Sequence, residues 1–384
     1  MFKKYRMKSY NYRLLCLMLL CSFYGIIIIN SVKPAYTVRQ VFGLAAAVVV
    51  MTLLSFIDYN WILKYYWVIY FGQIALLLAT RLFGYASHGA KRWIRLGPIN
   101  LQASELGKII LILFAVKILS MYKEIIDTWG FISVLWILLF VPLFLTLRQP
   151  DLSQTILTTS ILFILIFYAG VSYKKIGLVI LIVVPTVLGL LLYVQNPNQK
   201  LLKKYQRDRV MAFLQPEDND DGAYQQKYAA QAIGSGELTG KGLNNDDPSS
   251  LLNSGYIAEA QTDFIFAAMG EQLGFVGNIT AVLLLAAIVA ECFWTSHKAR
   301  DFTGRLIAMG VGVYIGLQTF INIGVVVQLL PNTGLALPFF SYGISSLMSL
   351  YIAMGIVLNV SLQRRIDQNI YTADFKDVRS IENL

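Results

Sequence analysis

The chain has 384 residues, of which 57% are hydrophobic and only 14% are charged, and its formal net charge is +10. A soluble domain carries roughly a quarter charged residues, so this composition excludes an ordinary water-soluble protein and indicates a polytopic membrane protein. In such a protein the excess positive charge indicates cytoplasmic loops that face anionic lipid, not nucleic acid. Three cysteines and two isolated histidines show no paired spacing, so no Cys- or His-based metal site is predicted.

The apolar stretches predict an all-α fold with about ten membrane spans, since a bilayer needs about 20 apolar residues per helix. By the positive-inside rule the basic N-terminus, residues 1–13, is cytoplasmic. Residues 14–366 form one membrane domain, and an even number of spans returns the tail, residues 367–384, to the cytoplasm. The expected spans are 14–32, 40–57, 61–82, 104–121, 129–147, 153–170, 175–195, 263–293, 304–329 and 340–361.

Between the seventh and eighth spans lies a large polar segment, residues 196–262, which this topology places outside the membrane. Residues 224–233 are compatible with a short amphipathic helix there. The glycines of residues 234–242 permit close approach of the backbone to a ligand, with Lys241 available for phosphate. A flexible loop is the alternative.

Residues 331–346 also lie at the predicted outer face, and two prolines and two glycines prevent them from forming one uninterrupted helix. Non-helical backbone near a membrane is tolerated where protein buries it or water reaches it. The pattern therefore predicts a re-entrant or cavity-lining loop.

The outer loop over residues 87–102 carries Lys91, Arg92 and Trp93 where the positive-inside rule depletes basic residues. Binding of an anion is one interpretation. Interfacial anchoring by Trp93 and its basic neighbours is the other. The turn at residues 148–151 places Asp151 at the start of the sixth span, where it is either part of the same polar group or a helix cap.

Glu105 and Lys108 open the fourth span at a spacing of three, so they lie on one helical face and can pair. Such charges at membrane depth usually face a protein interior or a wet cavity, although a purely structural ion pair remains the alternative. For Glu271 we expect a structural role, hydrogen-bonded to another helix. Asn322 and Gln328 are expected to be packing polar groups.

Asp263 stands where the long polar segment ends and the eighth span begins. Thr262 or Asp263 can cap the new helix, and a carboxylate there also meets the positive end of the helix dipole. A capping role is the simple interpretation. The polar clusters at the same predicted face favour a functional one.

Six segments in this order resemble the SEDS family (shape, elongation, division and sporulation), which includes RodA, FtsW and SpoVE. They are Gly89–Ile94, Ser104–Lys108, Gln149–Leu152, Gly240–Gly242, Thr262–Phe266 and Leu337–Gly343. The resemblance covers nearly the whole chain. Departures from the family pattern are Ser153, Ala258, Gln261, Gln272 and Ile344.

The resemblance implies a ten-helix peptidoglycan glycosyltransferase that polymerises lipid II at the outer face of the bacterial cytoplasmic membrane. The implied catalytic carboxylate is Asp263, which is also the residue that would hold a divalent cation, Mg²⁺ or Mn²⁺, if the reaction uses one. The residues expected to bind substrate are Lys91, Arg92, Trp93, Glu105, Lys108, Asp151, Lys241, Thr262 and Ser341.

The implied partners are lipid II, a lipid-linked glycan strand, membrane lipid and a class B penicillin-binding transpeptidase, with no nucleic acid. A flippase or other transporter for a lipid-linked precursor is the competing class, because intramembrane charges and broken helices also occur in transporters. A division or sporulation scaffold without catalysis is a third interpretation.

Overall fold

The structure is a computed structural model that describes residues 7–87, 90–96, 99–149, 151–196, 199, 207, 211, 220–245 and 250–364. The predicted cytoplasmic tail, residues 367–384, lies outside the described residues, as do residues 1–6 and much of the segment between residues 197 and 219.

Long helices make up the fold, as the composition predicts. The α-helices are α1 (Tyr12–Val32), α2 (Thr37–Phe56), α3 (Tyr59–Ile62), α4 (Tyr66–Phe83), α5 (Ala103–Met121), α6 (Trp129–Arg148), α7 (Leu152–Tyr168), α8 (Tyr173–Val194), α10 (Asp220–Ser235), α11 (Ile265–Lys298), α12 (Phe302–Val326) and α13 (Ile344–Leu362). Short 3₁₀ turns cover Met7–Ser9, Pro34–Tyr36 and Leu63–Tyr65.

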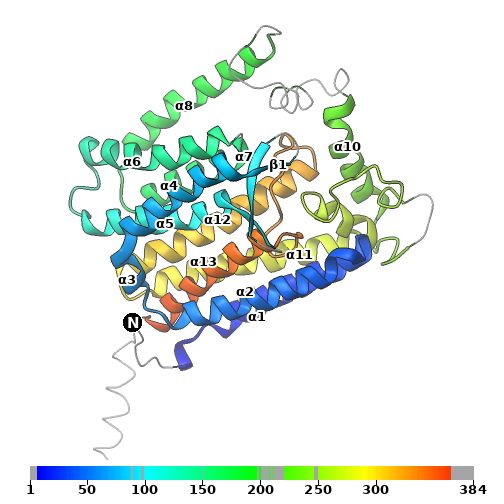
Figure 1. Ribbon diagram of the computed structural model, residues 1–384, viewed down its shortest axis with the longest axis horizontal. Coiled ribbons are helices and arrows are strands. Elements are labelled where there is room, and N and C mark those ends of the chain that lie inside the picture. The colour runs from blue at the N-terminus through cyan, green and yellow to red at the C-terminus, as the bar shows by residue number, and fades with distance from the viewer. Residues whose placement is uncertain are drawn as a thin grey trace, which may run out of the picture.

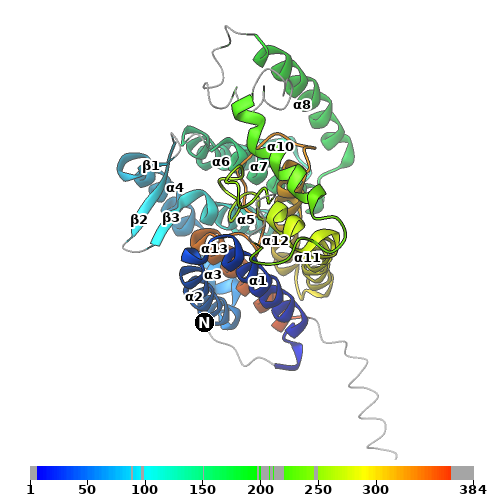
Figure 2. The same cartoon turned by 90° about the vertical axis from the view of Figure 1, so that its right-hand side faces the viewer.

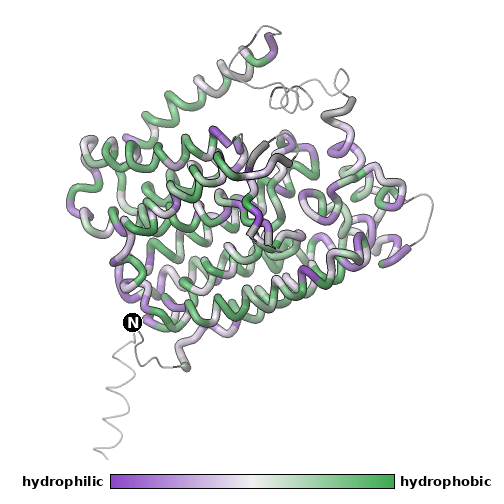
Figure 3. Tube along the Cα trace, in the orientation of Figure 1, coloured by the Kyte–Doolittle hydropathy of each residue, from purple (hydrophilic) through white to green (hydrophobic). Residues whose placement is uncertain are grey.

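Each of the ten predicted spans coincides with one of these helices. Within the described residues, seven helices are long and apolar enough to cross a membrane by length and composition, and α7 is a further apolar helix of 17 residues. This makes the chain a multi-pass membrane protein. Figure 3 shows the apolar residues following the long helices, while hydrophilic residues gather at helix ends and around α10.

The helices α12 and α13 lie at the centre of the bundle (Figure 1). In the most apolar window of α13, 78% of the residues are buried inside the protein, against 28% for the equivalent window of α6. The pairs α2–α13 and α11–α12 pack along one another, and α5 packs on α4, α7 and α12. Helix α8 stands apart from the bundle in both views (Figures 1 and 2).

The predicted outer loop over residues 87–102 forms, together with Tyr85 and Ala86, a small antiparallel sheet that the sequence did not predict. Its strands are β1 (Tyr85–Ser87), β2 (Ala90–Leu96) and β3 (Ile99–Gln102), in the order β1-β2-β3. Trp93 pairs with Tyr85 on one side and with Gln102 on the other. The sheet therefore holds β2 beside the start of α5.

The sheet, α10 and residues 331–343 all lie at the same ends of the helices, which we call the loop face (Figures 1 and 2). The opposite ends, where α1 begins and α13 finishes, form the N-terminal face. Residues 331–343 are non-helical, as the prolines and glycines predict.

The glycine-rich stretch after α10 has a different role from the predicted one, because its backbone docks on α11. Helix α11 is interrupted at Gly274, whose φ is 63°. The amides of Phe275 and Val276 donate to the carbonyls of Glu237 and Leu238, while Lys241 N donates to the Glu271 carbonyl. A Cβ on Gly236 would lie 1.9 Å from the Gly270 carbonyl oxygen. Gly236 therefore permits close approach of one backbone to another.

Candidate active site

A buried ion pair lies in the first turns of α5. Lys108 Nζ is 3.0 Å from Glu105 Oε2, and the two side chains are 0% and 4% exposed, so the predicted pairing is confirmed. Gln154 Nε2 on α7 donates to Glu105 Oε1 over 2.6 Å. Lys108 Nζ also donates to Gln318 Oε1 over 3.0 Å and lies 4.7 Å from the centre of the Tyr314 ring. Additional hydrogen bonds of this kind offset the desolvation penalty of a buried ion pair.

Helix α12 carries a polar stripe, Tyr314, Gln318 and Asn322, at a spacing of four residues. This spacing puts the three side chains on one helical face. Gln318 Nε2 donates to the Ala336 carbonyl over 2.8 Å. Asn322 Nδ2 donates to the Leu335 carbonyl over 2.7 Å and to the Asp263 carbonyl over 2.8 Å. The expectation that Asn322 packs as a polar group is confirmed, and its partners make it a direct link to Asp263.

Asp263 does not cap α11, so the capping interpretation is wrong. The helix begins at Ile265, and Phe264, not Thr262 or Asp263, occupies the N-cap position. A turn before it uses the Glu259 carbonyl to accept from the amides of Thr262 and Phe264. The Asp263 side chain is half-buried.

The segment before Asp263 is held from the other side by residues 337–342. Ser341 Oγ donates to the Thr262 carbonyl over 2.6 Å and accepts from Leu337 N over 2.8 Å. The amide of Tyr342 donates to the Gln261 carbonyl over 2.9 Å. Together with Asn322, these contacts fix the backbone of residues 261–263 between α12 and the loop.

Two predicted substrate-binding side chains, Thr262 and Ser341, thus make contacts within the protein. Thr262 Oγ1 donates to Glu259 Oε2 over 2.9 Å, and Gln261 Nε2 approaches the same oxygen at 3.3 Å. The structure places both residues beside Asp263, where they position the backbone around it.

Asp151 lies at the mouth of the same region. Its Oδ2 accepts from Gln102 Nε2 over 3.1 Å and from Ser104 Oγ over 3.0 Å, and its Oδ1 lies 3.7 Å from Arg92 Nη1. Although Asp151 occupies the N-cap position of α7, its side chain does not cap the helix. The capping alternative is therefore wrong, and the carboxylate instead joins β2, β3 and α5.

Trp93 and Lys91 are the two remaining predicted site residues of the outer loop. Trp93 is half-buried in β2, next to Arg92. Lys91 belongs to the same strand, but its side chain lies outside the described part of the structure.

Lys241 is the predicted site residue whose placement differs most from expectation. Its Nζ pairs with Glu271 Oε1 at 3.0 Å. Glu271, only 1% exposed, also accepts from the amides of Leu251 and Leu252 over 2.8 and 3.1 Å. Glu271 is therefore structural, as expected, but it binds a loop instead of another helix. Lys241 is a partner of that carboxylate, and its role as a phosphate ligand stays a prediction.

Three polar residues of the site, Gln154, Tyr314 and Gln318, were not predicted. The sequence marks each of them as a polar side chain within an apolar span. Such a side chain is energetically costly in a membrane unless it has a partner. Within the described residues, Gln154 Oε1, Tyr314 OH and the nearby Asn322 Oδ1 are buried and have no hydrogen-bond partner. Since buried polar atoms are normally paired, these atoms indicate contact with water or with polar groups of a ligand.

The described residues contain no group of three or more His, Cys, Asp or Glu side chains that could hold a metal ion. Mg²⁺ is commonly bound by one or two carboxylates together with substrate phosphates. Asp263 fits the role of one carboxylate ligand beside substrate phosphates. The described residues do not fit a site in which protein side chains alone hold the ion.

These features define a multi-pass membrane protein with a buried polar site near its loop face. A family described as cell cycle protein, named for FtsW, RodA and SpoVE, matches residues 11–366. The chain therefore belongs to the SEDS family.

Relatives and solved structures agree with this assignment. The probable peptidoglycan glycosyltransferase FtsW of Wigglesworthia glossinidia brevipalpis is 31% identical over 94% of this chain and 95% of its own length. The peptidoglycan glycosyltransferase MrdB of Escherichia coli strain K12 is 34% identical over 76% of each chain.

Among solved structures, a chain from a study of how a peptidoglycan synthase complex coordinates polymerization and crosslinking is 28% identical. It has a TM-score of 0.77 and covers 93% of this chain and 99% of that one. RodA of Thermus thermophilus has a TM-score of 0.68 at 25% identity, over 93% of this chain and 98% of its own.

Proposed function

We propose that this protein is an inverting peptidoglycan glycosyltransferase that polymerises lipid II at its loop face. The observation that carries the proposal is that one face of α12 joins Asp263 to the buried Glu105–Lys108 pair. Asn322 binds the Asp263 backbone, and Gln318, one turn away, binds Lys108. The activity of the named relatives supports the same reaction.

In the proposed reaction the 4-hydroxyl of the acceptor GlcNAc attacks the anomeric carbon of the donor MurNAc. The new C–O bond forms as the bond from the anomeric carbon to the pyrophosphate oxygen breaks, and the configuration inverts. The hydroxyl proton passes to the Asp263 carboxylate, because a hydroxyl is a weak nucleophile without a base. Undecaprenyl pyrophosphate leaves with the electron pair.

The charged groups divide between two tasks. Arg92, whose side chain is 24% exposed at the mouth of the site, is the residue that we assign to stabilising the leaving pyrophosphate. Lys108 is fully buried and bound to Glu105 and Gln318, so we assign it to holding α5 and α12 in register beside Asp263. A Mg²⁺ or Mn²⁺ ion shared by Asp263 and the pyrophosphate would add charge stabilisation, and no proposed step depends on it.

The proposal extends to location and partner. The loop face would be extracytoplasmic and both termini cytoplasmic, as the positive-inside rule predicts. A class B penicillin-binding transpeptidase would cross-link the strands, which is supported by the match to a chain from a complex of polymerization and crosslinking. Whether elongation, division or sporulation uses the enzyme depends on that partner.

The test uses purified protein with its transpeptidase and labelled lipid II. We expect Asp263→Asn to reduce polymer formation by at least about a hundredfold, the lower range for a lost general base, with an unchanged Tm. Glu237→Gln, which changes an exposed carboxylate after α10, is the control for loss of a carboxylate at the loop face. Polymer formation by Asp263→Ala at the wild-type rate would remove Asp263 as the base.

The same preparation separates the competing functions. Proteoliposomes loaded with lipid II in one leaflet would show transfer without polymer if the protein were a carrier. If Asp263→Ala restored growth and shape in cells that lack the wild-type protein, the scaffold interpretation would replace the enzymatic one.

A further inference from the structure

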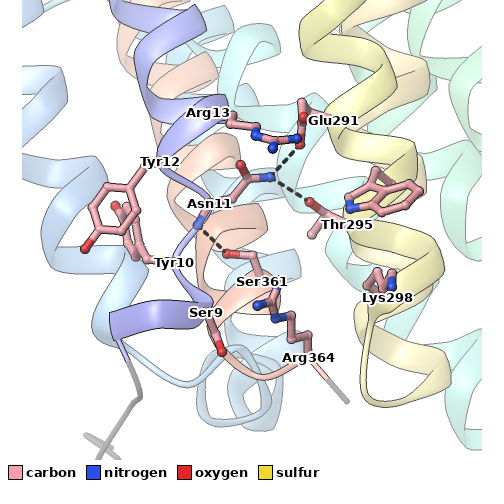
Figure 4. Close-up of a pocket in the computed structure, with 11 residues that line it drawn as sticks. Ser9, Tyr10, Asn11, Tyr12, Arg13, Glu291, Thr295, Lys298, Ser361 and Arg364 are labelled. Atoms are coloured by element: carbon pink, nitrogen blue, oxygen red, sulfur yellow. Dashed lines mark hydrogen bonds between the residues drawn. The ribbon is translucent and has the colours of Figure 1, made fainter. Parts of the chain in front are cut away.

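A polar pocket lies at the N-terminal face, at the opposite ends of the helices from the candidate active site. It has a volume of about 440 Å³. The residues before and at the start of α1 form one wall, the last turns of α11 another, and the end of α13 the third (Figure 4). The proposed glycosyltransferase reaction uses none of its residues.

The pocket is basic. Among the described residues that line it, three are basic, Arg13, Lys298 and Arg364, and one carries a carboxylate, Glu291. Figure 4 shows these three basic side chains arranged around the hydroxyls and amide of the other lining residues. Glu291 is already engaged, because Asn11 Nδ2 donates to its Oε2 over 2.9 Å. The arrangement therefore favours an anion over a cation.

The pocket also lies where a membrane–water interface is expected. It is built from the ends of three membrane helices, and its rim carries Tyr12 and Trp294, which are 55% and 57% exposed. Exposed aromatic residues at helix ends are typical of the headgroup level. Lys298 Nζ lies 5.1 Å from the centre of the Trp294 ring, which keeps the cation at this rim.

We propose that this pocket binds the phosphate of an anionic phospholipid in the leaflet at the N-terminal face. Arginine suits phosphate because its planar guanidinium can donate two parallel hydrogen bonds. Basic pockets between membrane helices bind anionic headgroups in this manner. The same chemistry would accept a soluble phosphate ester, but the aromatic rim and the helix ends place the pocket at lipid depth.

Phosphatidylglycerol is the probe for the experiment. A short-chain form is titrated into the protein in a zwitterionic detergent, and binding is measured by native mass spectrometry and by the rise in Tm. Short-chain phosphatidylcholine, glycerol phosphate and an oligoglutamate peptide are titrated in parallel. We expect phosphatidylglycerol to bind and the other three to bind at least tenfold more weakly.

The pocket variant is the triple change Arg13→Gln, Lys298→Gln and Arg364→Gln. Its affinity for phosphatidylglycerol should fall about a hundredfold, since each basic side chain near an anionic surface contributes roughly fivefold. The matched control changes three exposed lysines of the same face that do not line the pocket, Lys64, Lys123 and Lys174, to Gln. Arg13→Lys, which keeps the charge, should retain most of the binding if the triple variant proves unstable.

Three results would overturn the proposal. The first is equal binding of phosphatidylglycerol and phosphatidylcholine by the wild type. The second is retention of binding by the pocket variant, or its loss in the control. The third is stronger binding of glycerol phosphate or of the peptide, which would assign the pocket to a soluble phosphate ester or to an acidic protein segment.

Discussion

Gln318 and Asn322 lie one turn apart on α12 and bind successive carbonyls of the same loop, those of Ala336 and Leu335. Gln318 also accepts a hydrogen bond from Lys108, and Asn322 also donates one to the Asp263 carbonyl. A loop, a buried cation and the proposed base are therefore fixed by one helical face. A shift of α12 would displace all three together.

The first prediction concerns Asn322→Leu, which removes the donor to two carbonyls. An unsatisfied buried acceptor costs about 1–3 kcal/mol, so we expect a loss of stability in that range and a polymerisation rate reduced at least about tenfold. Thr319→Val on the same helix is the control, because Thr319 Oγ1 has no hydrogen-bond partner among the residues that the structure describes. Thermal unfolding and the rate of lipid II polymerisation, measured below the lower Tm, check this. Equal effects of the two changes would argue against the link to Asp263.

The second prediction concerns the ion pair. Removing one partner leaves a buried charge, so Glu105→Gln and Lys108→Met should each destabilise by about 3–5 kcal/mol. The double change Glu105→Leu and Lys108→Met should recover most of that stability, since apolar replacements of buried pairs are often neutral. We expect polymerisation to remain low in the stable double variant. A double variant that is both stable and active would show that the pair is only structural.

The third prediction compares two arginines of β2. Arg92 lies 3.7 Å from Asp151, whereas Arg95 is three positions along, and alternation puts it on the opposite face of the strand. Arg92→Ala should lower kcat/KM for lipid II at least about tenfold through loss of charge stabilisation, and Arg95→Ala by less than about twofold. Steady-state kinetics measure both effects. A larger loss of kcat/KM in Arg95→Ala than in Arg92→Ala would indicate that the anion binds on the other face of the sheet.

The fourth prediction concerns the docking of the glycine-rich stretch on α11. A Cβ on Gly236 would overlap the Gly270 carbonyl, at 1.9 Å, so Gly236→Ala should cost about 1–3 kcal/mol, the range for an overpacked contact. Gly234, in α10, has nothing within 4 Å of its Cβ position. Gly234→Ala should therefore stabilise the protein by up to about 1 kcal/mol. The denaturation midpoints of the two variants check these opposite changes in stability.

The sequence predicts those features whose cause is local. The helices follow from apolar length, and the Glu105–Lys108 pair follows from a spacing of three. The broken segment over residues 331–343 follows from its prolines and glycines. In each case neighbouring residues decide the structure, so the pattern alone is sufficient.

The features that the sequence does not predict depend on distant partners. Gln318 is separated from Lys108 by 210 positions, and no periodicity connects them. The docking of the glycines near Lys241 on the backbone of α11 was not predicted, because Glu271, which accepts from Lys241 N, lies 30 positions further along. Asp263 looked like a cap, but the preceding turn and the contacts from Asn322 and Ser341 set its position instead.

The burial of Lys108 has a consequence for how the chain is made. Glu105 and Lys117 share its helix, so α5 enters the bilayer with three charged residues. A charged residue opposes insertion by up to about 3 kcal/mol, the value that applies at the centre of a span. Ribosomes translate α12 long after α5, so the amide of Gln318 does not yet exist when the lysine arrives. Until then the nascent chain must shelter that ammonium group against its own glutamate or within the insertion machinery, and α5 takes its final place only when synthesis is nearly complete.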